Sequence, residues 1–491
     1  MKKSLLFVSM IAALCIAGCN NGGSSNTPTP SNSGDVSTSS GASESSDPVS
    51  SSSGEASKEE IKNEFFTLLT PTNLSSMSLN CKKYVDDMRA QQKKLLAEKG
   101  ANADYYLNDL YGTAGVDITK GIPDGDNGGY RPANHQSDYL DPVAAEWEKS
   151  EKSDESKGIE IEFTPAESLK GKEYTVYYSS NPEFHNAKTI KTSDTKAYIK
   201  NLFVNEKYYV KVAADGKSSQ TINFTTGDYP RWIDARPMFN VRDMGGYMTS
   251  SGQRIRQGLI YRGGEITPAV GWKANSWSSY TGDVGGRYTG SDGKMVDQHI
   301  TSQTDESKEV FRNVMGMIGG LEIDLRSSGE RNGYTKCGFA ENNDISYMLK
   351  EINSYDSPMK DANKRALIKD VFEAFAQADQ HPVYFHCYGG ADRTGVIGFM
   401  LGAVLGMSYT DLVIDFELTS YSSNPSRNYR SHLRSGPYNY WPRMIDYLKN
   451  TLNWNDSKTI KESMEYFLVN DCKISQNTID TIRNIMLEPA K

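Results

Sequence analysis

The stretch His386–Gly395 (HCYGGADRTG) decides the fold, because it lies between two apolar segments of different character. Pro382–Phe385 (PVYF) before it has the composition of a short buried strand, and Thr394–Met407 (TGVIGFMLGAVLGM) after it that of a buried helix. A strand, a glycine-bearing turn and a helix N-terminus together bind anions, because backbone N–H groups point into the turn and the helix dipole adds positive charge. The stretch therefore predicts a phosphate-binding loop in an α/β domain.

Cys387 and Arg393 are separated by five residues in this loop. The positive field favours the thiolate of Cys387, which can attack phosphorus. The planar guanidinium of Arg393 matches two phosphoryl oxygens. A lone cysteine beside glycines is usually a core residue, and a bare C-x5-R spacing recurs by chance. The combination of His386, the two glycines, the Asp-Arg-Thr-Gly ending and the flanking strand and helix favours catalysis instead. We therefore expect phosphomonoester hydrolysis through a cysteinyl-phosphate.

The other loop residues have expected roles around this pair. The Thr394 hydroxyl is expected to donate a hydrogen bond to the Cys387 sulfur, and His386 to orient the loop through backbone contacts. Loop backbone N–H groups and the guanidinium are expected to hold the phosphoryl group in line for attack. This phosphate-binding set comprises Tyr388, Gly389, Gly390, Ala391, Asp392 and Arg393.

The loop resembles that of the cysteine-dependent bacterial tyrosine and lipid phosphatases, which reads HCxxGxDRTG. Phe239–Tyr247 (FNVRDMGGY) is similar to that family's N-F-R-D-L-G-G-Y opening. Gln257–Gly264 (QGLIYRGG) and Glu322–Arg326 (EIDLR) are similar to two of its strands. These ordered matches cover Phe239 to Gly406, and the resemblance implies a central sheet flanked by helices. It also implies a tyrosine or dual-specificity phosphatase.

The resemblance makes Asp392, inside the loop, the first candidate for the general acid that protonates the leaving group. Asp324 and Asp356 are alternatives. Asp392 has a second interpretation as a cap of the following helix, and Asp324 as the partner of a buried arginine. Many relatives carry lysine where this chain has Ala391, which weakens any expectation of polyanionic or phosphoinositide substrates.

Arg242, Asp243 and Arg326 lie in the other matched segments. The resemblance implies that they shape the floor of the pocket. An Arg/Asp network that holds the loop in position is an equally good interpretation.

The N-terminus predicts where this chemistry takes place. Residues 1–19 combine a cationic start with an apolar stretch too short for a permanent membrane span, and they end in Ile-Ala-Gly-Cys19, which resembles a bacterial lipobox. We expect cleavage before Cys19 and lipidation of its thiol, although an ordinary secretory signal is an alternative. Residues 20–58 are rich in Ser, Gly, Thr and Pro and are expected to form a disordered tether. The expected location is extracytoplasmic, lipid-anchored to a bacterial membrane.

Composition limits the partners. The chain has 491 residues and a formal net charge of −8, and without a Lys/Arg block this balance argues against nucleic acid. None of the six cysteines forms a CxxC pair or a Cys/His cluster with metal-ligand spacing, so we expect no metal and no cofactor. The expected partners are a phosphorylated protein or small-molecule substrate, and a membrane through the anchor alone.

Three further regions follow the tether. Residues 59–141 are partly helical, with a helix expected over Lys82–Lys99, and have no assigned function. Residues 142–227 alternate apolar and polar residues in short strands, and the Leu202-to-Tyr208 spacing is that of a tyrosine corner. This part resembles a fibronectin type III β-sandwich, either a binding module or a spacer packed on the enzyme. Residues 228–491 are the expected catalytic domain, with an insertion loop over Pro268–Asp297.

Three other functions compete with a protein phosphatase. One is scavenging of small phosphomonoesters, including inositol phosphates. Another is a non-catalytic surface lipoprotein that binds phosphorylated ligands, although such a protein has no need of Cys387 as a thiolate. The third is sulfur transfer on a rhodanese-like loop, against which the Asp-Arg-Thr-Gly ending argues.

Overall fold

The computed structural model describes residues 58–100, 156–266, 303–352, 361–422 and 447–490, apart from 329, 332–334 and 456, and four short strands at 122–124, 129–131, 287–289 and 295–297. All of them belong to one compact unit, Glu55–Lys491. Among these residues no helix is both long and apolar enough to cross a membrane. The predicted signal peptide with Cys19, almost all of the tether, Asp356 and most of Pro268–Asp297 lie outside the described residues.

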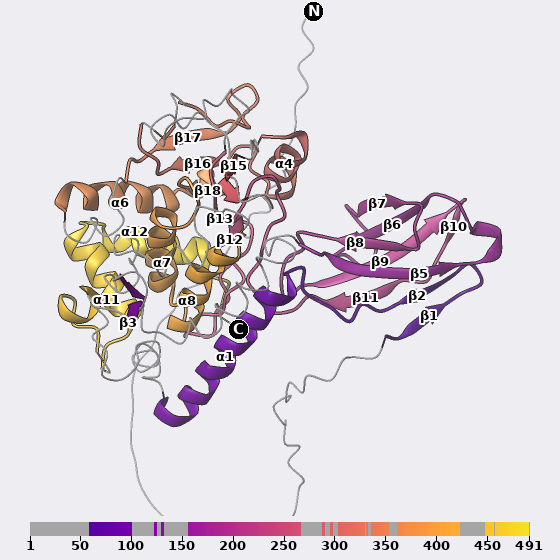
Figure 1. Cartoon of the computed structure of the whole chain (residues 1–491), viewed down its shortest axis with the longest axis horizontal. Coiled ribbons are helices and arrows are strands. Elements are labelled where there is room, and N and C mark those ends of the chain that lie inside the picture. Colours follow the sequence, from indigo (N-terminus) through magenta and orange to yellow (C-terminus); the bar gives the residue numbers. More distant parts are fainter. Residues whose placement is uncertain are drawn as a thin grey trace, which may run out of the picture. The chain divides into compact units, whose positions relative to one another are not determined.

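A five-stranded sheet forms the centre of the C-terminal α/β domain (Figure 1). Its first two strands pair antiparallel and the other pairs are parallel. In spatial order the strands are β12 (Arg242–Asp243), β13 (Ile260–Gly263), β18 (Val383–His386), β16 (Leu321–Asp324) and β17 (Ser346–Leu349). The strands expected in Gln257–Gly264, Glu322–Arg326 and Pro382–Phe385 correspond to β13, β16 and β18, so the expected central sheet is confirmed.

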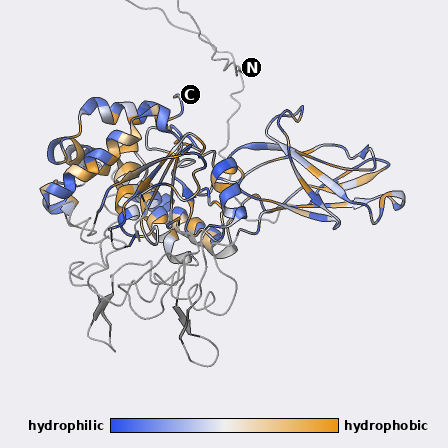
Figure 2. Ribbon diagram, turned by 90° about the horizontal axis from the view of Figure 1, so that it is seen from above, coloured by the Kyte–Doolittle hydropathy of each residue, from blue (hydrophilic) through white to orange (hydrophobic). Residues whose placement is uncertain are grey.

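Alternate residues of the strands enter two different cores, as the two-residue period of a strand requires. Ile260, Ile323 and Phe385 join the larger core with the helices, whereas Tyr261 and Tyr384 join a smaller core with η3 (Val310–Val314). Figure 2 shows hydrophobic residues gathered on one side of several helices and hydrophilic residues on the other. The helices of the C-terminal half that contribute to the larger core include α6 (Ala362–Phe375), α7 (Arg393–Leu405), α8 (Tyr409–Glu417), α11 (Ile460–Tyr466) and α12 (Gln476–Met486).

Helix α7 is the most deeply placed of these helices. Every residue from Arg393 to Leu405 is buried, which explains why the sequence is apolar on all sides rather than along one stripe. The helix ends at Gly406, whose φ of +94° is the left-handed conformation typical of a C-terminal glycine. The predicted strand, loop and buried helix are therefore confirmed.

Two further sheets pack face to face around a common core that includes Phe163, Tyr174 and Val212. The first has the order β1 (Glu60–Lys62), β2 (Phe66–Leu69), β5 (Ile159–Pro165), β8 (Lys196–Ile199). The second contains β10 (Lys217–Ser218), β9 (Lys207–Ala214), β6 (Tyr174–Ser179) and β7 (Lys188–Thr192), with β11 (Ile222–Thr225) also on β9.

The boundary predicted at residue 142 is wrong, because two strands of the sandwich come from the preceding region. Strand β2 pairs antiparallel with β5, so that Phe66 lies opposite Pro165 and Leu68 opposite Phe163. Short strands of only three or four residues carry too little pattern to be distinguished in the sequence from loop.

Helix α1 (Leu79–Lys99) follows these strands and confirms the helix expected over Lys82–Lys99. Ser78 caps its first turn, and Gly100, with φ +67°, ends it. Its buried face, which includes Val85 and Met88, belongs to the larger core of the α/β domain. Residues 59–141 therefore contribute to both the sandwich and the α/β domain.

Candidate active site

The predicted phosphate-binding loop connects the middle strand of the sheet to its most buried helix. Strand β18 ends at His386 and α7 begins at Arg393, so Cys387–Asp392 form the connection. The Cys387 residue is only 2 % exposed. The nucleophile expected from the sequence therefore lies at the carboxyl end of a strand and close to a helix N-terminus.

Three consecutive carbonyl groups of the loop point outward to neighbouring segments. In a planar trans peptide the carbonyl of one residue and the N–H of the next point in opposite directions. The N–H groups of the three residues that follow these carbonyls therefore point into the loop, as a phosphate cradle requires. The pairs are Tyr388 O with Glu265 N at 3.1 Å, Gly389 O with Asn240 Nδ2 at 3.0 Å, and Gly390 O with Arg262 Nη2 at 2.9 Å.

Gly390 is required at its position for two reasons. Its φ is +63°, which L side chains rarely adopt. A Cβ atom there would lie 2.3 Å from the carbonyl carbon and oxygen of Gly263 on β13. The loop and the neighbouring strand therefore approach too closely for any side chain.

Arg393 is held by a residue that the sequence reasoning missed. Its Nη1 lies 2.6 Å from Oε2 of Glu330 and its Nη2 lies 2.7 Å from Oε1, a bidentate ion pair. Ser327 donates to the same carboxylate from its backbone N–H and its hydroxyl, each at 2.8 Å. Burial alone would raise the pKa of Glu330, but the hydrogen bonds from Arg393 outweigh it and hold that pKa below its usual value. The only signal in the sequence was an acidic residue shortly after the matched Glu322–Arg326 strand.

The Thr394 hydroxyl does not make the hydrogen bond expected from the sequence. Its Oγ1 is buried and has no hydrogen-bond partner within the described part of the chain. A buried hydroxyl without a partner is costly and calls for an explanation. Because Thr394 lies at the start of α7, a bound ligand or a rearranged loop would supply the missing hydrogen-bond partner.

His386 precedes Cys387 and bonds on both sides of its ring. Its Nδ1 lies 3.0 Å from the Cys387 carbonyl oxygen and its Nε2 lies 2.9 Å from Oε1 of Glu322. The Cys387 carbonyl can only accept, so Nδ1 carries a proton and donates to it. Burial opposes a positive charge on the ring, but Asp324 and Glu322 outweigh it and raise the pKa of His386. The expected backbone contact of His386 is therefore present.

Asp324 belongs to a buried ion-pair network rather than to a proton-donating site. Arg326 donates to it from Nε and Nη2, at 2.9 Å and 2.6 Å, and the Tyr347 hydroxyl donates at 2.9 Å. Burial would raise the pKa of Asp324, but the His386 charge and the Arg326 hydrogen bonds lower it to about 2. Arg326 also pairs with Glu265 at 2.7 Å. Asp324 is therefore unsuited as the general acid, and its interpretation as the partner of a buried arginine is confirmed.

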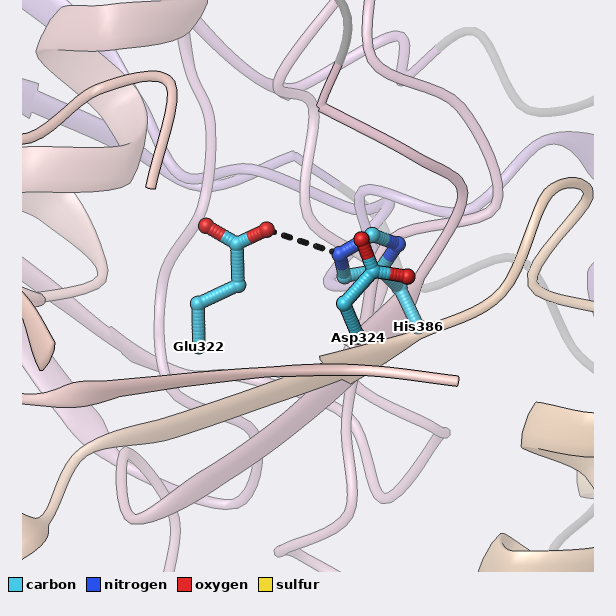
Figure 3. Close-up of side chains that lie close together, drawn as sticks. All are labelled: Glu322, Asp324 and His386. Carbon is cyan, nitrogen blue, oxygen red and sulfur yellow. Dashed lines mark hydrogen bonds and ion pairs between the residues drawn. The ribbon is translucent and has the colours of Figure 1, made fainter. Parts of the chain in front are cut away.

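Glu322, Asp324 and His386 have the spacing of a metal site, because one ligand atom from each lies within 4.8 Å of the others (Figure 3). Each residue already has partners inside the protein: the His386 ring bonds Glu322, and Asp324 bonds Arg326 and Tyr347. The Arg326 guanidinium already occupies the Asp324 carboxylate that a metal ion would need as a ligand. We therefore read the three residues as an ion-pair network behind the loop.

Arg242 supports the loop from beneath. It is fully buried, bonds Asp415 through Nε at 3.1 Å, and contacts the side chain of Asn240, whose amide holds the Gly389 carbonyl. Asp415 also pairs with Arg262, which holds the Gly390 carbonyl. The network interpretation thus holds for Arg242, and Asp415 is a further supporting residue that the sequence did not reveal.

Asp243 faces away from the loop. It pairs with Arg231 at 2.6 Å and accepts hydrogen bonds from the backbone N–H groups of Gly245 and Gly258. These contacts fix two turns around β12 and β13, so Asp243 also belongs to the supporting network.

Asp392 occupies the N-cap position of α7, but its side chain makes no capping hydrogen bond. Asp392 is half-buried and directly precedes Arg393 in the chain. The capping interpretation is therefore wrong, and the role of Asp392 as general acid stays a prediction.

Comparison with known families agrees with this geometry. The profile of the tyrosine phosphatase family matches residues 233–275 and 283–488, a span that contains the loop, the sheet and the supporting network. The chain belongs to the tyrosine phosphatase family, and it is a phosphatase. A search of curated proteins finds no match to the chain.

Proposed function

We propose that this chain is a protein-tyrosine or dual-specificity phosphatase that acts through a cysteinyl-phosphate on Cys387. The observation that carries the proposal is the outward direction of the three loop carbonyls, which turns the following N–H groups toward the loop interior beside a fixed Arg393. Such an arrangement stabilises the charge on three phosphoryl oxygens in the ground state and in the transition state.

The proposed reaction has two displacements. In the first, the Cys387 thiolate forms a bond to phosphorus, the bond from phosphorus to the leaving oxygen breaks, and Asp392 gives that oxygen a proton. In the second, water attacks phosphorus, its proton passes to Asp392, and the sulfur–phosphorus bond breaks to release phosphate and the thiolate. The Thr394 hydroxyl, unpartnered in the described structure, donates to the sulfur as it becomes a leaving group.

The burial of the nucleophile supports an aryl phosphate as substrate. Cys387 is 2 % exposed, and a flat phenyl phosphate reaches a recessed sulfur more easily than the shorter phosphoserine. Ala391, in place of the lysine of many relatives, removes a cation that would favour inositol phosphates or phosphoinositides. Scavenging of small phosphomonoesters and non-catalytic binding of phosphorylated ligands are the alternatives that the assay below separates.

We propose further that the enzyme works at the cell envelope as a lipoprotein anchored through Cys19, on the strength of the N-terminal sequence alone. The sandwich is proposed to be fibronectin type III-like. Its sheets have the strand orders β2-β5-β8, with β1 added at one edge, and β7-β6-β9-β11, with β10 also paired to β9. The backbone N–H of Phe203 donates to the Tyr208 hydroxyl at 3.1 Å, which is the hydrogen bond of a tyrosine corner.

The testing experiment is hydrolysis of p-nitrophenyl phosphate by the chain from Asn20 onward, with reductant and EDTA, beside Cys387→Ser. We expect turnover that Cys387→Ser abolishes, followed by preference for phosphotyrosine peptides over phosphoserine peptides and inositol phosphates. Binding of phosphopeptide without turnover would support the non-catalytic alternative. Turnover retained in Cys387→Ser would refute the proposed mechanism.

A further inference from the structure

The corner of the sandwich between β8 and β9 is bound to the phosphatase domain by two reciprocal amide pairs. The Asn201 side chain donates to the Asp234 carbonyl at 3.1 Å and accepts from the Asp234 N–H at 2.7 Å. The Gln257 side chain accepts from the Val204 N–H at 2.8 Å and donates to the Val204 carbonyl at 2.9 Å. Each side-chain amide therefore accepts a hydrogen bond from, and donates one to, the backbone of a single residue in the other domain.

Arg231 completes the junction, and its side chain is only 3 % exposed. It donates to the carbonyls of Asn201 and Leu202, each at 3.1 Å, and its guanidinium lies 4.1 Å from the centre of the Phe203 ring. Its remaining nitrogen bonds Asp243 at 2.6 Å. One buried cation therefore depends on the sandwich for two acceptors and on the phosphatase domain for its counter-charge.

Asp243 links this junction to the two strands that support the phosphate-binding loop. Its carboxylate accepts from the N–H groups of Gly245 at 2.8 Å and Gly258 at 2.7 Å, which fixes the turns after β12 and before β13. In these paired strands Arg242 lies opposite Arg262. Arg242 supports the loop through Asn240, and Arg262 supports it directly through the Gly390 carbonyl.

From these contacts we propose that the corner Asn201–Val204 is a positioning element of the phosphatase, and that the sandwich must be docked through it for full activity. The inference rests on the proposed function and extends it. The sandwich acts on the reaction by fixing β12 and β13, because residues of these strands hold the loop carbonyls. A displacement of about 1 Å at a reacting group is enough to lower the rate about a hundredfold.

The test uses the double variant Asn201→Gly with Gln257→Ala in the otherwise full chain. Glycine tolerates the φ of +61° at residue 201, so the variant removes the amide without adding backbone strain. Asn205→Gly is the matched control, because Asn205 is exposed in the same corner and has a φ of +53°. The readouts are kcat and KM for p-nitrophenyl phosphate, and hydrogen exchange of the peptide that contains Cys387–Arg393.

We expect the folded double variant to lose at least tenfold in kcat with KM within threefold of wild type, and its loop amides to exchange faster. The control should match wild type in both readouts. A folded double variant with wild-type kcat and wild-type loop exchange would overturn the proposal. If the double variant does not fold, Gln257→Ala alone gives the same comparison. If wild type has no activity, the proposed function fails, and loop exchange still decides whether the corner positions the loop.

Discussion

Arg393 and Glu330 form a bidentate ion pair in which both terminal guanidinium nitrogens reach the carboxylate, at 2.6 Å and 2.7 Å. The arginine that is expected to bind the transferring phosphoryl group is thus oriented before substrate arrives. Preorganised donors are worth more than flexible ones, since they need no rearrangement during the reaction.

Replacement of Glu330 tests that orientation. We expect Glu330→Gln to lower kcat/KM by roughly tenfold to a hundredfold, because a neutral amide cannot hold the guanidinium by two charge-assisted hydrogen bonds. Glu373→Gln is the control, since Glu373 lies on α6 with its side chain 46 % exposed. Steady-state kinetics with p-nitrophenyl phosphate measure both. Equal kcat/KM in Glu330→Gln and wild type would show that the pair does not orient Arg393 for the reaction.

Thr394→Val separates the stability of the protein from its activity. The hydroxyl is buried and unpartnered in the described structure, so an apolar group of the same shape should leave the free energy of unfolding unchanged or slightly higher. The rate should fall by roughly tenfold to a hundredfold if the hydroxyl donates to the Cys387 sulfur during turnover. Urea unfolding and pre-steady-state kinetics measure the two quantities, and Thr394→Ser should recover most of the rate. A Thr394→Val enzyme with wild-type kinetics would remove Thr394 from the mechanism.

Gly390→Ala should disable the loop. The new methyl group would overlap the Gly263 carbonyl at 2.3 Å, so loop and strand would have to separate and at least a hundredfold in kcat/KM should be lost, about 3 kcal/mol. Gly319→Ala is the matched control, because its φ is also positive, at +85°, but nothing lies within 4 Å of the added carbon. The control should keep its activity and lose only about 1 kcal/mol of stability in urea unfolding. Similar activities in the two variants would contradict the close approach of loop and strand.

Asp324 should make the stability of the protein depend on acid pH. Its folded pKa of about 2 lies below the ordinary value of 3.8, because the His386 charge and the Arg326 hydrogen bonds outweigh burial. A lowered folded pKa stabilises the protein above the unfolded value, and this stabilisation is lost as pH falls from about 4 toward 2. The shift corresponds to roughly 2 kcal/mol.

Urea unfolding of wild type and Asp324→Asn at several pH values measures this contribution. We expect the variant to be several kcal/mol less stable at pH 7, since it leaves Arg326 with one carboxylate fewer, and the difference to shrink below about pH 4. A difference that is independent of pH would mean that Asp324 does not titrate as the ion pairs require.

The parts of the site that the sequence predicted are those formed by neighbouring residues. Strand β18, the loop and α7 are continuous in the chain, so their apolar pattern and glycines indicated them directly. The helix over Lys82–Lys99 was likewise readable from its own periodicity and its terminal glycine.

The supporting residues could not be predicted because their partners are far away in the sequence. Asp415 pairs with Arg242 and Arg262, which are 173 and 153 residues distant. Strand β2 pairs with β5 across the whole of α1 and the segment after it, and nothing local distinguishes strands of three or four residues from loop. Only the fold brings these groups together, and a single sequence carries no record of such pairings.

The covalent intermediate tests the central claim most directly. Wild-type protein would be mixed with p-nitrophenyl phosphate, quenched in acid within milliseconds, and digested for mass spectrometry of the peptide that contains Cys387. We predict that this peptide carries the added mass of one phosphoryl group during turnover, and that Cys387→Ser shows neither adduct nor turnover. Turnover by wild type without any adduct, together with retained activity of Cys387→Ser, would contradict a cysteinyl-phosphate mechanism at this loop.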